Sequence, residues 1–139
     1  MYDPKNILYI ISAIAAAEKA IHYGKVFITP TQLLEANDQM NFNATNTLLI
    51  AIAEEIKKTD KQLLQSQPHI QWQNIADMRN LLAHDYRGID PEIVFSVVKN
   101  ELPKLTTALV HILKLFPSNL IQEILDTKRY QHLQQIINQ

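Results

Sequence analysis

A chain of 139 residues is long enough for one domain with a substantial core, and its 47% hydrophobic and 19% charged residues exclude a disordered protein. The absence of cysteine excludes disulfides, thiolate metal sites and cysteine nucleophiles. A formal net charge of −1 gives no overall basic field, so any contact with RNA must use a local patch.

The longest apolar run, residues 7–17, is followed directly by Glu18 and Lys19. It is shorter than the roughly 20 residues that a membrane-spanning helix needs, and no cleavage site typical of a signal peptide follows it. We therefore expect a soluble, cytoplasmic protein with no membrane contact.

The first half of the chain has the apolar periodicity of helices. Asp3-Pro4 is typical of a helix start and Gly24 of a helix end, which predicts a helix over about residues 4–23. Residues 25–40 fit either a short helix or a loop. A stripe of leucine and isoleucine then predicts one helix over about 42–65.

The second half continues this pattern. A shorter helix begins at Trp72, with its apolar side (Ile75, Met78, Leu81 and Leu82) expected to face the core, and a long helix follows in which Pro103 should produce a kink. The predicted fold is all-α: an antiparallel bundle of four or five helices over 1–116, with 117–139 as an appended amphipathic C-terminal helix of the same domain.

The stretch MRNLLAHDYRGID, residues 78–90, holds the residues with the clearest chemistry. On a helix Arg79, Asn80, His84 and Tyr86 occupy one broad side, although Arg79 and His84 differ by about 140°. Arginine suits a phosphate, and histidine, with an unperturbed pKa of about 6.5, suits proton transfer near neutrality. Without a metal-ligand cluster, the pattern indicates metal-free phosphodiester chemistry.

One histidine supplies only one of the two proton transfers that RNA cleavage needs. A two-fold homodimer that apposes this side with its copy would supply two histidines and two arginines. The alternative is that Arg79 and His84 are capping and surface residues, because helix ends often carry cations.

The order of these residues resembles the HEPN superfamily, and specifically the HepT-like toxins: Arg79, four residues, His84, one residue and Tyr86, with Asn80 after the arginine. The resemblance extends over about residues 1–116. It includes the acidic IAEE sequence at 52–55 and the Asp-Pro helix start at 90–91.

The resemblance implies a metal-independent endoribonuclease without a cofactor, acting on tRNA or mRNA as a homodimer with a composite site in the dimer cleft. It implies acid–base chemistry for His84, phosphate positioning and transition-state stabilisation for Arg79, and a hold on the scissile group for Asn80. Glu54 resembles a glutamate that recurs in the family's second helix. It is expected to orient Arg79, to bind across the core, or to be an ordinary exposed charge on an amphipathic helix.

In HepT-like toxins the tyrosine at the position of Tyr86 accepts AMP from a cognate minimal nucleotidyltransferase antitoxin, which silences the nuclease. A bulky anion beside Arg79 and His84 would compete with an RNA phosphate. Alternatively, Tyr86 packs its ring at the helix end. Two other functions stay open: a non-catalytic helical partner that presents substrate to a nucleotidyltransferase, and a structural dimerising bundle.

The remaining candidates have ordinary structural interpretations. We expect Trp72 to be a core anchor, and we expect the scattered histidines to be structural: His22, His69, His111 and His132. Four cations could broaden an RNA-facing patch or simply solvate the surface: Lys57, Lys58, Lys61 and Arg87. The segment 117–139 can pack on its own bundle, on a second protomer or on the antitoxin.

Overall fold

The structure is a computed structural model, and it describes residues 2–84 and 88–138, with the side chains of residues 83 and 84 outside that description. Every regular element in these ranges is helical, which confirms the predicted all-α fold class. In chain order the α-helices are α1 Lys5–Gly24, α2 Pro30–Glu35, α3 Met40–Lys58, α4 Lys61–Gln65, α5 Trp72–His84, α6 Pro91–Ser96, α7 Leu102–Leu113, α8 Ser118–Leu125 and α9 Gln134–Ile137.

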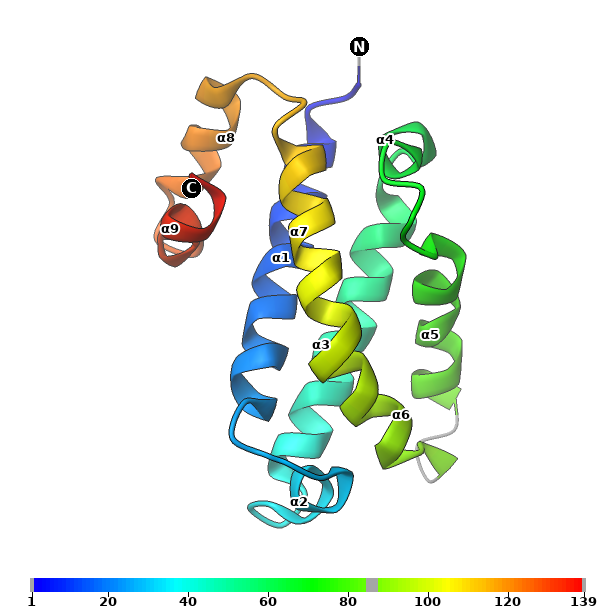
Figure 1. Ribbon diagram of the computed structural model, residues 1–139. Coiled ribbons are helices and arrows are strands. Elements are labelled where there is room, and N and C mark those ends of the chain that lie inside the picture. The colour runs from blue at the N-terminus through cyan, green and yellow to red at the C-terminus, as the bar shows by residue number, and fades with distance from the viewer. Residues whose placement is uncertain (1, 85–87, 139) are drawn as a thin grey trace.

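The long helices form an up-and-down bundle, in which α1, α3, α5 and α7 run side by side along the long axis of the molecule (Figure 1). α1 packs against both α3 and α7, and α3 also packs against α5. α2 packs against α3 and α6 at one end of the bundle. α5 is therefore attached to the bundle mainly through α3.

α1 is the central helix because it is apolar on several sides. Ile7, Ile10, Ile11 and Ile14 are each 1% exposed or less. A helix that is hydrophobic around most of its circumference gains stability by contacting several neighbours at once. Within the described part of the chain, no helix combines the length and the apolar character that crossing a membrane requires.

The helix predicted over 42–65 is interrupted, so the single-helix prediction is wrong at residues 59 and 60. Thr59 has extended backbone, and its hydroxyl donates to the carbonyl of Glu55 at 2.8 Å. The Asp60 N–H donates to Oδ1 of Asn6 at 2.8 Å, and the Asp60 carboxylate caps α4 at the N–H of Gln62. Because side chains bond the backbone N–H groups that the break leaves without helical partners, the break costs little folding free energy.

The kink predicted at Pro103 takes the form of a π-helical turn, Val97–Glu101, between α6 and α7. The N–H of Leu102 bonds the carbonyl of Val97, five residues back. Proline has no N–H, and its ring crowds the carbonyl four residues earlier, so a wider turn beside Pro103 accommodates it.

The prediction that residues 117–139 form one appended helix is wrong. The segment consists of α8, a 3₁₀ turn at Gln131–Leu133 and α9. It packs on its own bundle: Leu125 and Leu133 are fully buried and join the same core as α1 and α7. The hydroxyl of Tyr130 lies 2.9 Å from that of Ser12 on α1. Residues 126–130 turn the chain between α8 and the 3₁₀ turn. A continuous helix would lack this turn and would carry Leu133 away from the core.

Candidate active site

α5 carries the motif and is fixed at its start by Trp72, the predicted core anchor. Trp72 is 7% exposed, and its indole N–H donates to the carbonyl of Gln67 at 3.1 Å. Leu82 is buried near the other end of the helix, and Met78 is half-buried. Leu81 departs from prediction, because it is 52% exposed and lies at a shallow cavity of about 70 Å³ rather than in the core.

Arg79 reaches from α5 to α3, where its Nε donates to Oε1 of Glu54 at 2.6 Å. The two side chains are 41% and 43% exposed, so the pair faces solvent. Exposed ion pairs contribute only about 0–1 kcal/mol to stability. What the contact does supply is direction, because a charge-assisted bond at Nε restrains the guanidinium.

The other motif residues follow along the same helix. Asn80 is exposed, and His84, the last residue of α5, lies one helical turn beyond it. The helical backbone from Arg79 to His84 keeps the two positions about 140° apart around the axis. The His84 side chain and all of Asp85, Tyr86 and Arg87 lie outside the described residues, so the expectations for His84, Tyr86 and Arg87 stay predictions.

The lysines of the predicted patch have different surroundings. Lys58 bonds Glu55 at 3.1 Å, and its ammonium lies 5.0 Å from the centre of the Tyr9 ring. Lys57 and Lys61 are exposed. Lys58 therefore faces α1, whereas the structure shows no contact between these lysines and Arg79 among the described residues.

His22, His69, His111 and His132 are all exposed, and they lie on α1, the α4–α5 loop, α7 and the 3₁₀ turn respectively. Among the residues that the structure describes, no three histidine or acidic side chains are placed to hold one metal ion.

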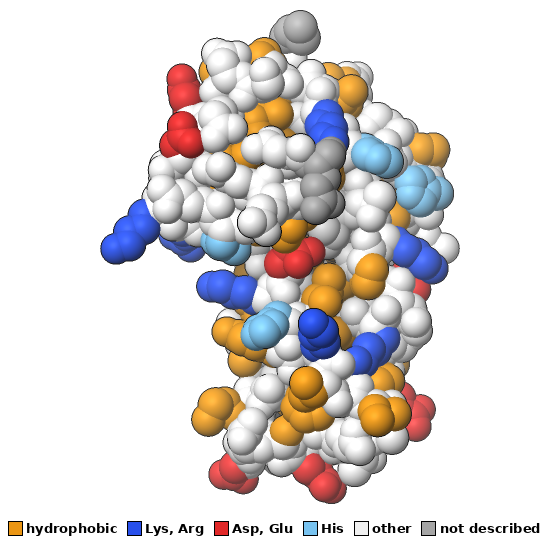
Figure 2. Space-filling view, turned by 60° about the vertical axis from the view of Figure 1, so that its left-hand side comes forward, with side chains coloured by type: hydrophobic (Ala, Val, Ile, Leu, Met, Phe, Trp, Pro, Cys, Tyr) orange, Lys and Arg blue, Asp and Glu red, His pale blue; other side chains and the backbone are white. Residues whose placement is uncertain are grey.

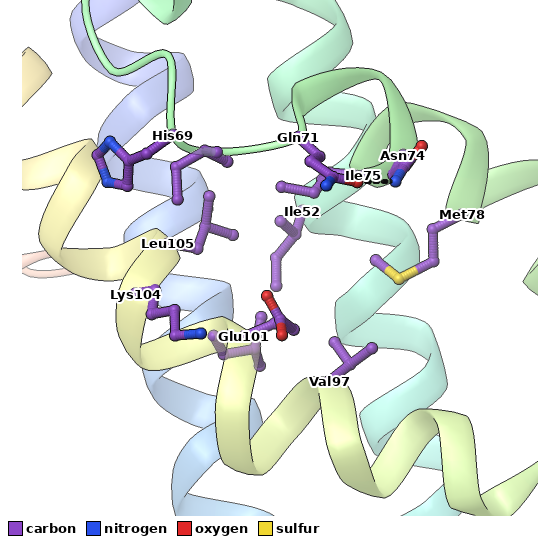
Figure 3. A pocket seen from close by; sticks show the side chains of 12 residues that line it. Ile52, His69, Gln71, Asn74, Ile75, Met78, Val97, Glu101, Lys104 and Leu105 are labelled. Carbon is purple, nitrogen blue, oxygen red and sulfur yellow. Dashed lines mark hydrogen bonds between the residues drawn. The ribbon is translucent and has the colours of Figure 1, made fainter.

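A larger cavity of about 490 Å³ opens on the side of α5 that faces α7 (Figure 3). Its walls are mostly aliphatic, and polar side chains stand at its edge, among them His69, Glu101 and Lys104 (Figure 3). Arg79 is not among its lining residues. Sequence analysis did not anticipate this cavity, because it arises from the spacing between α5 and α7, for which no local sequence signal exists.

Comparison with known proteins identifies the class to which this fold and motif belong. The family model described as "Ribonuclease HepT-like" matches residues 13–112, a range that contains Glu54, Arg79, Asn80, His84 and Tyr86. The chain belongs to this family of HepT-like ribonucleases, which confirms the resemblance found in its sequence. The match ends before the C-terminal segment 117–139.

Curated relatives carry ribonuclease names. "Putative RNase MJ1216" of Methanocaldococcus jannaschii is 29% identical over 98 residues, which are 68% of this chain and 81% of the relative. "Putative RNase MJ0125" of the same organism is 35% identical over 48% of this chain and 57% of its own length. "Probable ribonuclease HepT" of Thermococcus cleftensis is 33% identical over 39% of this chain and 49% of its own length. No solved structure matches the chain. Family and names together support a ribonuclease activity.

Proposed function

We propose that this protein is a metal-independent endoribonuclease whose reaction centre is the Arg79–His84 turn of α5. The observation that carries the proposal is the exposed Arg79–Glu54 pair, since it fixes a cation on the motif helix of a ribonuclease family. A restrained and solvent-facing guanidinium can bind a phosphodiester and stabilise the extra negative charge of its transition state.

In the proposed reaction the ribose 2′-hydroxyl attacks the adjacent phosphorus, and the bond from phosphorus to the 5′-oxygen breaks. A neutral His84 takes the proton from the 2′-hydroxyl, and a protonated His84 gives a proton to the leaving 5′-oxygen. Arg79 binds the non-bridging oxygens, and Asn80 holds the scissile group. Because Arg79 and His84 lie about 140° apart on one helix, we propose that two chains form a homodimer with a composite site.

The test is cleavage of labelled RNA by the purified protein in excess EDTA. We expect the wild type to cleave and Arg79→Ala and His84→Ala each to lose at least about a hundredfold in rate, because each removes a group that acts in the transition state. His111→Ala is the control, since His111 is an exposed histidine that lies on α7, outside the motif. Equal rates for the wild type and both motif variants would contradict the assignment.

We further propose that the protein is the toxin of a toxin–antitoxin pair, silenced when a cognate minimal nucleotidyltransferase transfers AMP to Tyr86. The added phosphate would place a negative charge beside Arg79 and His84, where it opposes RNA binding. Arg79, His84 and Tyr86 all lie within residues 13–112, the range that matches the family model.

Intact mass after incubation with that nucleotidyltransferase and ATP tests the silencing step. We expect mass increments of AMP that map to Tyr86, loss of RNA cleavage, and no increment in Tyr86→Phe. AMP on another residue, or none, would remove Tyr86 from the scheme. Modification of a wild type that never cleaves RNA would instead favour the non-catalytic partner.

A further inference from the structure

A further cavity, of about 210 Å³, lies where the C-terminal segment meets α1 and α3. We call it the tail cleft. Its polar lining comes from three parts of the chain: Ser12, Lys19, Glu55, Arg129, Tyr130 and His132. The C-terminal residues among these lie beyond the range that matches the family model, so the tail cleft is a feature that the segment 117–139 adds.

The lining of the tail cleft favours an anion. Lys19, Arg129 and His132 bring donors to it, and no ion pair links any of the three to a carboxylate in the described part of the chain. The single carboxylate in the lining, Glu55, is bonded to Lys58 at 3.1 Å, which offsets its charge. Figure 2 shows basic and histidine side chains below the lobe that the C-terminal segment forms, with acidic and hydrophobic side chains among them.

Buried anchors hold the C-terminal residues in place. Tyr130 is 8% exposed, and its hydroxyl lies 2.9 Å from the hydroxyl of Ser12. Leu133 is fully buried just beyond it. The guanidinium of Arg129 lies 5.6 Å from the centre of the Tyr130 ring, a cation–π distance. The cleft is therefore organised before any ligand arrives, which lowers the entropy cost of binding.

The tail cleft and the Arg79–Glu54 pair both lie along one stripe of α3. Ala51, Glu54, Glu55 and Lys58 form one stripe along this helix, at the spacing of three and four residues that lines up side chains. Glu54 bonds Arg79 on the α5 side of the stripe, whereas Glu55 lines the tail cleft on the α1 side. Because Glu54 and Glu55 are consecutive residues of α3, the two sites meet at adjacent positions of this helix.

We propose that the tail cleft binds a backbone phosphate of the RNA substrate, on a strand that crosses α3 to reach Arg79. The proposal rests on the proposed ribonuclease function for the identity of the ligand. It assigns a role to the segment 117–139: to add a phosphate contact outside the reaction centre. Such a contact raises affinity for any RNA sequence, because backbone contacts carry no base information.

The experiment measures binding of a short single-stranded RNA with methylated 2′-hydroxyls, which this chemistry cannot cleave, across a range of salt. We expect Lys19→Gln and Arg129→Gln each to weaken binding about fivefold at 0.1 M salt and to reduce the slope of log affinity against log salt by about 0.7. Lys128→Gln is the matched control, since Lys128 is exposed, adjacent to Arg129 and outside the lining. Glu55→Gln should strengthen binding.

Equal RNA affinity for Arg129→Gln, Lys19→Gln and Lys128→Gln would overturn the proposal, as would a wild type that does not bind the RNA. A parallel titration with AMP separates the two sources of phosphate: loss of AMP binding without loss of RNA binding also overturns it. Cleavage is read separately. If the wild type cleaves RNA and the variants bind RNA as the wild type does, only the proposal for the tail cleft is refuted. If the variants bind RNA more weakly but the wild type does not cleave it, only the proposed ribonuclease reaction is refuted.

Discussion

At the scale of residues, the Arg79–Glu54 contact determines how the motif can work. Arginine alone has many rotamers, and a phosphate site needs its guanidinium in one direction. Glu54 supplies this restraint from the neighbouring helix at 2.6 Å. In the proposed function, Glu54 is therefore a positioning residue and Arg79 is the group that would contact the phosphate.

Glu54→Gln is the first prediction at this scale. The neutral amide holds Arg79 more weakly, so we expect kcat for RNA cleavage to fall about ten- to a hundredfold with little change in KM or Tm. Glu54→Asp should restore part of the rate. Asp77→Asn, which removes an exposed carboxylate of α5 that bonds Gln73, serves as the control and should leave kcat unchanged. A rise in KM alone, with kcat intact, would refute the positioning role.

At the scale of elements, the glycine at the end of α1 is needed for close packing rather than for an unusual backbone conformation. Gly24 was predicted as a helix stop, and it is the last residue of α1 without adopting a positive φ. A Cβ built on Gly24 would lie 2.9 Å from Cγ1 of Val98, in the π-helical turn. The glycine thus permits close contact between α1 and the wide turn beside Pro103.

The second prediction follows from this contact. Gly24→Ala should destabilise the protein by about 1–2 kcal/mol, since overpacking outweighs the better helix propensity of alanine. Val98→Ala in the same chain removes the clashing methyl and should make the Gly24→Ala change neutral or stabilising. Urea unfolding of the four proteins of this double-mutant cycle measures the coupling. Additive effects would show that the two residues do not interact.

Sequence periodicity predicted the long helices because apolar side chains recur every three to four residues in α1, α3, α5 and α7. It could not predict the break at Asp60, which depends on Asn6, a residue 54 positions away. Nor could it predict the π-helical turn. This turn accommodates the ring of Pro103, and its residue Val98 lies close to Gly24. The tail cleft could not be predicted from the sequence either, because Lys19, Glu55 and Arg129 come together only in the folded chain.

At the scale of the whole molecule, local charge matters more than the net charge of −1. The described acidic residues near the two proposed phosphate sites are largely paired: Glu54 with Arg79 and Glu55 with Lys58. A homodimer would double the cations at the reaction centre without changing the balance of each chain. The motif residues themselves were found from the sequence, whereas the contact between Arg79 and Glu54 was an expectation from the family resemblance alone.

The most direct test of the account compares two RNAs, in EDTA, that differ at one position. One has ribose throughout, and the other has a single deoxyribose at the mapped cleavage site, which removes the attacking 2′-hydroxyl. We predict that the first is cut to a 2′,3′-cyclic phosphate and a 5′-hydroxyl, that the second is not cut at that site, and that His84→Ala cuts neither. Equal cutting of both RNAs, or cutting that requires an added metal ion, would contradict the proposed chemistry of the Arg79–His84 turn.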